Sequence, residues 1–294
     1  MNAFAPNTMV PLLGERLYLE LRPQQRCLVL HFNNEKTRNA VDPDLAKALA
    51  LLCNALQNLN SAHPAAALIH AHIYSVLVLK SHTPGVFLSG GDLKAIISFD
   101  AQQGELFTSQ MRSFTEFLRS GSLISIALLN GVAAGGGSEI ALACDLRIAT
   151  HSSARLDLAQ TRWGVPAGWG MMTDLRRHGV FSSERRRGLA VATQESWDST
   201  CLQNLGLLDA CFDQCALPDE AFETWLKEWL GRLQQCPLEL SKALVHERPR
   251  LPTEDLDEFD KKLFSQYWLG EVHRTRVADF IRSRRNSKED SGAP

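Results

Sequence analysis

The stretch that decides the fold is NGVAAGGGSEIALACDLRIA, residues Asn130–Ala149. Three consecutive glycines, Gly135, Gly136 and Gly137, separate an apolar run from a segment with a helical pattern, and Glu139 stands just inside that helix. Glycine lets a ligand come close to the backbone, and N–H groups at a helix N-terminus point outward with the helix dipole behind them. The stretch therefore indicates a backbone that binds negative charge, followed at once by a carboxylate.

Two familiar glycine motifs do not fit these letters. A phosphate-binding P-loop needs a lysine where Gly137 stands, and a nucleophile elbow centred on Ser138 needs a glycine where Ile140 stands. Two interpretations stay open: a flexible loop before a helix, and an oxyanion hole, in which backbone N–H groups stabilise negative charge that develops on a carbonyl oxygen.

An oxyanion hole usually takes two donors, and a second loop has the same form. GVFLSGGDLKAI, Gly85–Ile96, runs from an apolar strand through Gly90 and Gly91 into a helix that Asp92 can cap. Two such loops on one sheet could place two N–H donors side by side at the strand ends, where open α/β sheets bind their ligands.

The rest of the chain alternates short apolar runs with longer helical patterns. This alternation predicts an α/β core with parallel strands. The predicted strands are LYLELRP and RCLVLHF with a turn at Pro23, then AHIYSVLVLKS, LISIALLNG and DLRIAT; a helix is predicted over DPDLAKALALLCNALQNLN. From about Asp219 onward only helical patterns remain.

Composition sets further limits. The chain has 294 residues, of which 45% are apolar and 22% charged, and its net charge is −2, so nothing favours a nucleic-acid or membrane-surface partner. Seven scattered cysteines without a metal-ligand spacing indicate a reduced, cytoplasmic protein with no metal site. His70 and His72 alternate beside a predicted strand, but no third ligand lies nearby in the sequence. The segment Ser61–His72 suggests no role.

Both glycine loops resemble those of the crotonase superfamily, the enoyl-CoA hydratase/isomerase family, and the resemblance runs from Gly14 to Arg285. It implies an α/β crotonase (ClpP-like) fold of repeated β-β-α units with a C-terminal helical region. The implied organisation is a core over 14–217, a helical trimerisation region over 218–285 and a disordered tail over 286–294. A homotrimer or a dimer of trimers is expected, acting on an acyl-CoA or acyl-carrier thioester. No cofactor is expected beyond the coenzyme A of the substrate.

The resemblance also implies roles for individual residues. The N–H groups of Gly91 and Gly136 would form the oxyanion hole, and Glu139 would act on the substrate as the catalytic carboxylate. The expected substrate-binding residues are the loop residues Ser89, Gly90 and Gly135, with Lys36 and Arg38 beside the coenzyme A.

One position departs from the hydratases of this family, which place a second glutamate around the reacting water. Counting back from Gly164, that position is Gln160, whose amide can orient a group but cannot act as a general acid or base. The turn GVPAGWG also resembles that of ethylmalonyl-CoA decarboxylase-like members. The favoured reaction is therefore that of a lyase, the decarboxylation of a malonyl-type thioester. An enoyl-CoA hydratase or isomerase and a non-catalytic acyl-CoA-binding protein remain alternatives. Arg162, two residues further on, is more simply a surface ion pair than a substrate ligand.

Overall fold

The computed structural model describes residues 7–57, 74–237, 240, 243–247, 255–268 and 270–290. The chain divides into two compact units, Met1–Val245 and His246–Pro294. The segment 61–72, with His70 and His72, lies outside the described residues, so the structure does not bear on the predictions made for it. Within the described residues, no helix is both long and apolar enough to span a membrane.

The first unit is built on a seven-stranded sheet. Its first three strands pair antiparallel and its remaining neighbours pair parallel. In spatial order the strands are β1 (Thr8–Leu13), β2 (Leu17–Arg22), β3 (Cys27–Phe32), β4 (Val76–Ser81), β6 (Ile124–Leu129), β8 (Leu146–Ala149) and β11 (Ala210–Cys211). The predicted turn at Pro23 is confirmed as the short 3-10 helix η1 (Pro23–Gln25), which ends at Arg26 in the left-handed region.

A second sheet has four strands, three of which directly follow a central strand of the large sheet in the chain. Its spatial order is β10 (Ser196–Asp198), β9 (Arg155–Asp157), β7 (Gly131–Ala134) and β5 (Gly85–Leu88). The pairs β4–β5, β6–β7 and β8–β9 each lead into helical turns, so the β-β-α repeat expected from the family resemblance is confirmed. Strands β5, β7 and β9 run parallel, and their carboxyl ends therefore share one edge.

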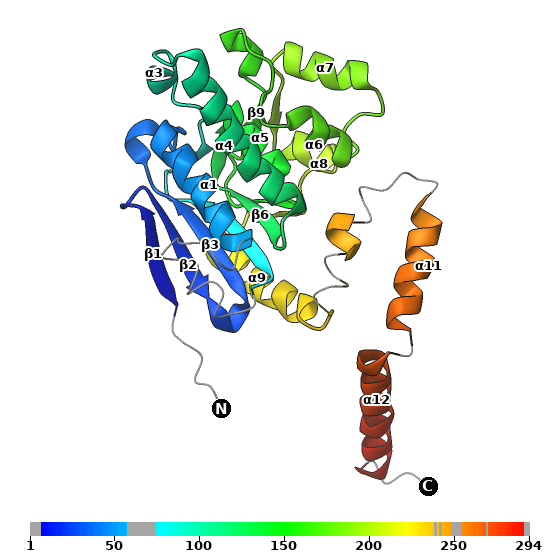
Figure 1. Cartoon of the computed structure of the whole chain (residues 1–294). Helices are drawn as coiled ribbons and strands as arrows, with labels where there is room; N and C mark the ends of the chain where they lie inside the picture. Colours follow the sequence, from blue (N-terminus) through cyan, green and yellow to red (C-terminus); the bar gives the residue numbers. More distant parts are fainter. Residues whose placement is uncertain are drawn as a thin grey trace. The chain divides into compact units, whose positions relative to one another are not determined.

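Helices cover the large sheet on both faces. On one face α1 lies beside α4, as Figure 1 shows, and this face carries the larger apolar cluster. The helices of this unit are α1 (Pro43–Gln57), α3 (Leu93–Ile96), α4 (Ala101–Ser120), α5 (Gly136–Ala143), α6 (Met171–Arg177), α7 (Glu184–Ala192), α8 (Ser199–Asn204) and α9 (Pro218–Leu233), with the 3-10 helices η2 (Glu35–Thr37) and η3 (Gln160–Trp163). The π-helical turn η4 (Ala243–Glu247) spans the boundary between the units.

The opposite face of the large sheet is covered by α9. Phe222, Leu226 and Leu230 recur at helical spacing and pack in one buried cluster with Val29 and Val78 of the central strands. The sequence placed the start of the helical region at residue 218, whereas the structure divides the chain after Val245. The difference is α9, which belongs to the first unit because its apolar face is buried against the sheet.

The second unit contains α11 (Leu256–Tyr267) and α12 (Glu271–Asp290). The helical patterns that the sequence predicts here form two helices, with a break near Gly270, where Trp268 has extended backbone angles. The prediction of a disordered tail from residue 286 is corrected as far as Asp290, because α12 continues to that residue. The segment NSKED contains neither glycine nor proline, so no residue in it ends the helix.

Candidate active site

The two glycine loops leave the same edge of the small sheet and touch each other. Strands β5 and β7 pair parallel, with Gly85 opposite Gly131, so the loops that follow them emerge together. A β-carbon added to Gly90 would lie 2.8 Å from the carbonyl oxygen of Ala134 and 3.1 Å from the backbone nitrogen of Gly136. The loops predicted to cooperate are therefore in direct contact.

The N–H groups of Gly91 and Gly136 are both free to meet a ligand. The N–H of Val41 donates to Gly90 O at 2.7 Å, and the N–H of Asp92 donates to Val41 O at 2.9 Å. This β-bridge between Val41 and Gly91 therefore does not use the N–H of Gly91. Gly136 is the first residue of α5, where a backbone N–H has no acceptor within the helix. Within the part of the chain that the structure describes, neither N–H is hydrogen-bonded to another protein group.

Each position of the GGG run favours glycine for a different physical reason. Gly135 has a φ of +53°, in the left-handed region that favours glycine. A β-carbon on Gly136 would collide with the indole ring of Trp169, and one on Gly137 would collide with the carbonyl of Leu88. The run therefore combines one unusual backbone conformation with two close contacts.

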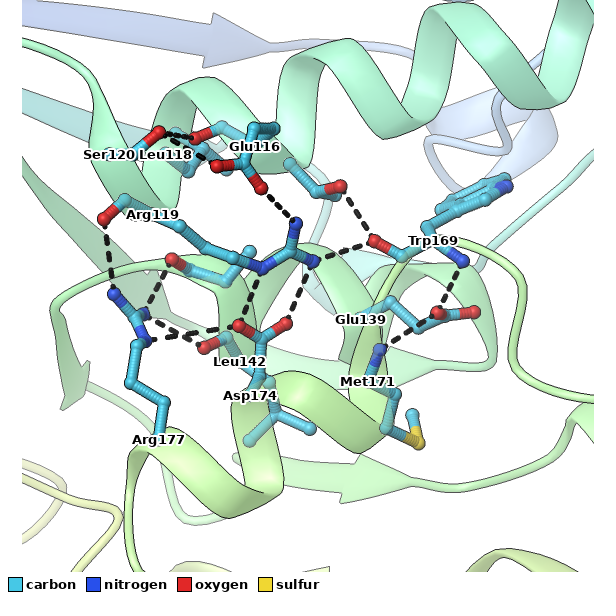
Figure 2. A network of polar contacts seen from close by, with 12 residues as sticks. Glu116, Leu118, Arg119, Ser120, Glu139, Leu142, Trp169, Met171, Asp174 and Arg177 are labelled. Carbon is cyan, nitrogen blue, oxygen red and sulfur yellow. Dashed lines mark hydrogen bonds and ion pairs between the residues drawn. The ribbon is translucent and has the colours of Figure 1, made fainter. Parts of the chain in front are cut away.

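Glu139 is buried in the first turn of α5, with 2% of its surface exposed. Its Oε2 accepts from the N–H of Trp169 at 2.7 Å and from the N–H of Met171 at 3.3 Å, the contacts drawn in Figure 2. Its Oε1 accepts from the N–H of Gly168 at 3.3 Å. Burial raises the pKa of Glu139, although these hydrogen bonds act in the opposite direction. The carboxyl group is therefore held rigidly where its protonated form is favoured more than in water.

Gln160 is the partner of Glu139 across the site. It begins η3, is 5% exposed, and its Nε2 donates to Glu139 Oε1 at 3.2 Å. Its own Oε1 is buried and has no hydrogen-bond partner among the described residues. The structure thus places an amide, and not a second carboxylate, beside Glu139.

A buried ion pair supports the turn that holds Glu139. Arg119 of α4 donates to Asp174 of α6 from Nε at 2.7 Å and from Nη2 at 3.0 Å, and Asp174 is fully buried. Nη2 also donates to Trp169 O at 2.7 Å, on the same residue whose N–H holds Glu139 (Figure 2). Gly170 has a φ of +114°, and a β-carbon there would collide with the Arg119 guanidinium. The sequence analysis did not find this support, since Arg119 and Asp174 share no motif.

The two glycine loops, Glu139 and Gln160 line one cavity of about 1060 Å³. Of the residues predicted to act or to bind substrate, all but one line it: Arg38, Ser89, Gly90, Gly91, Gly135, Gly136, Glu139 and Gln160. Lys36, within η2 and two residues before Arg38, does not line it. Arg162 lines the cavity too, and its Nε donates to Gln194 at 3.2 Å in place of the surface ion pair expected from the sequence. The charged residues Lys94, Arg155 and Asp157 and the aromatic residues Phe99, Phe107, Trp163 and Trp169 also line the cavity.

The described residues contain no group of three or more His, Cys, Asp or Glu placed to hold a metal ion. Within those same residues, the seven cysteines are free.

Comparison with known proteins gives consistent results. The family model described as enoyl-CoA hydratase/isomerase matches residues 23–285. The mitochondrial methylglutaconyl-CoA hydratase of Mus musculus is 31% identical over 221 residues, which cover 74% of this chain and 64% of the relative. The ethylmalonyl-CoA decarboxylase of Homo sapiens is 29% identical over 201 residues, which cover 65% of this chain and 62% of the relative. The chain thus spans just under two thirds of the length of these relatives.

Solved structures agree on the fold. The enoyl-CoA hydratase from Bacillus anthracis superimposes with a TM-score of 0.72 at 20% identity, over 91% of this chain and 96% of that chain. The enoyl-CoA hydratase from Thermoplasma volcanium gives a TM-score of 0.71 at 20% identity, over 90% and 97%. With the match of the family model to residues 23–285, these findings show that the chain belongs to the enoyl-CoA hydratase/isomerase family, the crotonase superfamily.

Proposed function

We propose that this protein is a lyase that decarboxylates a malonyl-type acyl-CoA thioester. The observation that carries the proposal is the contact between Glu139 Oε1 and the amide of Gln160, at 3.2 Å. Glu139 is the one carboxylate in this contact and can supply one proton, which is what decarboxylation requires. Asp157 also lines the cavity, but it is paired with Arg155 at 3.1 Å. A second carboxylate beside Glu139 would repel the carboxylate of the substrate.

The reaction balances with the groups present. The bond between the α-carbon and the carboxylate carbon breaks, carbon dioxide leaves, and the electron pair enters the thioester as an enolate. The N–H groups of Gly91 and Gly136 donate to the enolate oxygen, and each such donor stabilises the transition state by about 3 kcal/mol. Glu139 then gives its proton to the α-carbon and regains one from water. One proton is consumed for each carbon dioxide released.

The cations on the cavity lining fit a substrate that carries phosphate groups. Arg38 and Lys94 have no ion-pair partner among the described residues and line the same cavity as the two glycine loops. We propose that Arg38 binds coenzyme A, with Lys94 as an additional contact that the sequence analysis did not single out. The role proposed for Lys36 has less support, because Lys36 is absent from the cavity lining.

Hydration of an enoyl-CoA is the second candidate. It is favoured by the relatives, since a methylglutaconyl-CoA hydratase is 31% identical to this chain and an ethylmalonyl-CoA decarboxylase is 29% identical. In that reaction Glu139 would have to both deprotonate water and reprotonate carbon, with Gln160 only orienting the water.

A panel of thioesters separates the two reactions. Malonyl-, methylmalonyl-, ethylmalonyl-, crotonyl- and methylglutaconyl-CoA are incubated with the wild type and with Gln160→Glu, and the products are identified by mass spectrometry. The wild type is expected to release carbon dioxide from at least one malonyl-type thioester and to hydrate the enoyl forms poorly. Gln160→Glu is expected to gain hydration and to lose decarboxylation by about 10-fold or more, because the added charge repels the substrate carboxylate. Efficient hydration by the wild type would replace the decarboxylase proposal with the hydratase one.

A further inference from the structure

The amide of Gln160 is satisfied at one end only. Its Nε2 donates to Glu139 Oε1 at 3.2 Å, while its Oε1 is buried without a protein partner within the described residues. A buried acceptor with no donor costs about 1 to 3 kcal/mol. Since Gln160 lines the cavity, a group that enters the cavity can meet the unsatisfied end of the amide.

The two oxygens of Glu139 are not equivalent. Oε2 is held by the N–H groups of Trp169 and Met171, the nearer at 2.7 Å. Oε1 faces Gln160 and has only the longer backbone contact, at 3.3 Å from Gly168. A proton on the carboxyl group is therefore best placed on Oε1, next to the glutamine. Burial raises the pKa of Glu139, which brings this protonated form closer to neutral pH.

Protonation of Oε1 reverses the hydrogen bond that Gln160 can make. The glutamate then donates, so the amide must present its oxygen to Glu139. A half-turn of the terminal amide achieves this without changing the volume of the side chain, since that torsion is broad and the amide oxygen and nitrogen are almost the same size. The turn satisfies the orphaned oxygen and moves Nε2 to the end of the amide that was unsatisfied before.

We propose that the orientation of the Gln160 amide follows the proton on Glu139, and that in the protonated state Nε2 binds the carboxylate of the incoming thioester. This inference rests on the proposed decarboxylation. With Glu139 ionised, the free end of Gln160 is an acceptor, and both groups repel a carboxylate. With Glu139 protonated, the free end is a donor and the repelling charge is gone. Substrate and proton therefore bind together, and the proton is in place when carbon dioxide leaves.

Other charged groups near this pair are already engaged or lie at the cavity wall. Arg155 and Asp157 on β9 pair with each other at 3.1 Å, and Arg162 on η3 donates to Gln194. On α4 and α6, Arg119 pairs with Glu116 and Asp174, and Arg177 lies 3.9 Å from Asp174. Arg38 and Lys94 are on the cavity lining. The influences on the pKa of Glu139 are burial and hydrogen bonds to Trp169, Gln160, Met171 and Gly168. Titration of Glu139 on binding is thus expected to report on the ligand carboxylate.

The test uses two unreactive ligands that differ only in the charged group. S-(2-carboxyethyl)-CoA has the length of malonyl-CoA with a methylene in place of the thioester carbonyl, and S-propyl-CoA replaces its carboxylate with a methyl group. Binding to the full-length protein is measured by titration calorimetry in buffers of different ionisation enthalpy from pH 6 to pH 9. Above the pKa of Glu139, the carboxyethyl ligand is expected to take up about one proton and to lose affinity about 10-fold per pH unit. The propyl ligand is expected to show neither effect.

The variant Gln160→Met keeps the length of the side chain and removes both hydrogen-bonding ends. It is expected to weaken the carboxyethyl ligand about 10-fold or more, the scale of a lost charge-assisted hydrogen bond, and to leave the propyl ligand unchanged. Gln203→Met makes the same chemical change on the exposed surface of α8 and should alter neither affinity. Equal weakening of both ligands by Gln160→Met, or binding of the carboxyethyl ligand without proton uptake, would overturn the inference while leaving the proposed function standing. If the wild type binds neither ligand, the proposed acyl-CoA function fails, and the inference fails with it.

Discussion

At the scale of single residues, Glu139 is the group on which the chemistry depends. Helix N-termini favour carboxylates, so a glutamate in this turn has a structural reason to be there without any reaction. The carboxyl group has more hydrogen-bond donors and is more deeply buried than stabilisation of a helix N-terminus requires. Three backbone N–H groups and one amide converge on a carboxyl group that is only 2% exposed, inside a cavity that also holds Gly91 and Gly136.

The substitution Glu139→Gln separates an enzyme from a binding protein. It keeps the shape of the side chain and removes proton transfer, so turnover of the best thioester is expected to fall about 100-fold or more. Affinity for the thioester should change little, because the glycine N–H groups remain. Steady-state kinetics and calorimetry measure the two quantities. Glu116→Gln makes the same change on an exposed side chain of α4 and serves as the control. An unchanged turnover in Glu139→Gln would favour the non-catalytic alternative.

At the scale of secondary structure, the site depends on how α4 and α6 hold the turn between them. The turn from Gly168 to Met171 directs its N–H groups at Glu139 while Arg119 holds the carbonyl of Trp169 from behind. A displaced turn would therefore leave Glu139 buried with fewer donors, which raises the cost of its ionised form.

The substitution Asp174→Asn tests this support. It leaves the buried guanidinium of Arg119 without its bidentate partner, which is expected to lower the free energy of unfolding by about 3 kcal/mol. Urea denaturation gives that value, and turnover of the same variant shows whether the turn has moved. Glu184→Gln removes a half-exposed partner of two arginines and should cost clearly less than Asp174→Asn, because solvent screens these pairs. Equal effects of the two variants would show that the buried pair contributes no more than a surface one.

A second polar cluster links β2 and β3 to α9. The rings of Tyr18, His31 and His82 stack, and His31 Nε2 lies 3.1 Å from Glu20 Oε2. Arg22 pairs with Glu20 at 2.8 Å and with Glu223 of α9 at 2.9 Å. Burial by itself raises the pKa of Glu20, but hydrogen bonds from His31 and Arg22, together with their charges, lower it to about 2.

This lowered pKa makes a prediction about stability and pH. Because the folded value lies below the unfolded value of 4.5, the ionised Glu20 stabilises the fold at every pH above 4.5, and this contribution disappears as the pH falls toward 2. Glu20→Gln is expected to cost on the order of 2 kcal/mol at pH 7. The difference from wild type should shrink as the pH falls below 4.5 in urea titrations. Glu223→Gln, at a more exposed carboxylate, should cost less than about 1 kcal/mol. A difference that is undiminished at pH 3 would contradict the assignment.

At the scale of the whole molecule, the apolar cores belong to the first unit. Both buried clusters consist of residues up to Val245, whereas α11 has no buried residue, and Phe264 and Trp268 are 60% and 52% exposed. The family resemblance suggests that the helical region joins copies of the chain into trimers, and we retain this as a proposal.

Truncation after Val245 tests both the location of the apolar cores and the proposed role of the helical region in assembly. The shortened chain is expected to unfold cooperatively, with a midpoint within about 5 °C of the full chain, because it keeps both cores. It is also expected to form a smaller assembly, since it lacks the exposed aromatic side chains of α11. Thermal unfolding and sedimentation velocity measure the two properties. A truncated chain of unchanged assembly size would place the subunit contacts in the first unit.

The sequence by itself determined the class of fold and the two loops at its centre. These features are written in short stretches: strands and helices show through the period of their apolar residues, and the GGG run and the capped Gly90–Gly91 loop are local signals. The count from Gly164 also put Gln160 at the position of the family's second glutamate, and in the structure its amide nitrogen lies 3.2 Å from Glu139 Oε1. The end of α12 and the assignment of α9 were less predictable, because each depends on what the helix packs against or on the absence of a helix breaker.

Only the tertiary structure decided how Glu139 is held. The backbone donors from Gly168 to Met171 carry no side-chain signature, and Arg119 and Asp174 lie 55 residues apart. Buried polar groups need hydrogen-bond partners, and these partners can lie far apart along the chain. The sequence alone therefore does not show which arginine pairs with a buried carboxylate. For the same reason, the sequence could not indicate that Gln160 Oε1 is buried without a hydrogen-bond partner among the described residues.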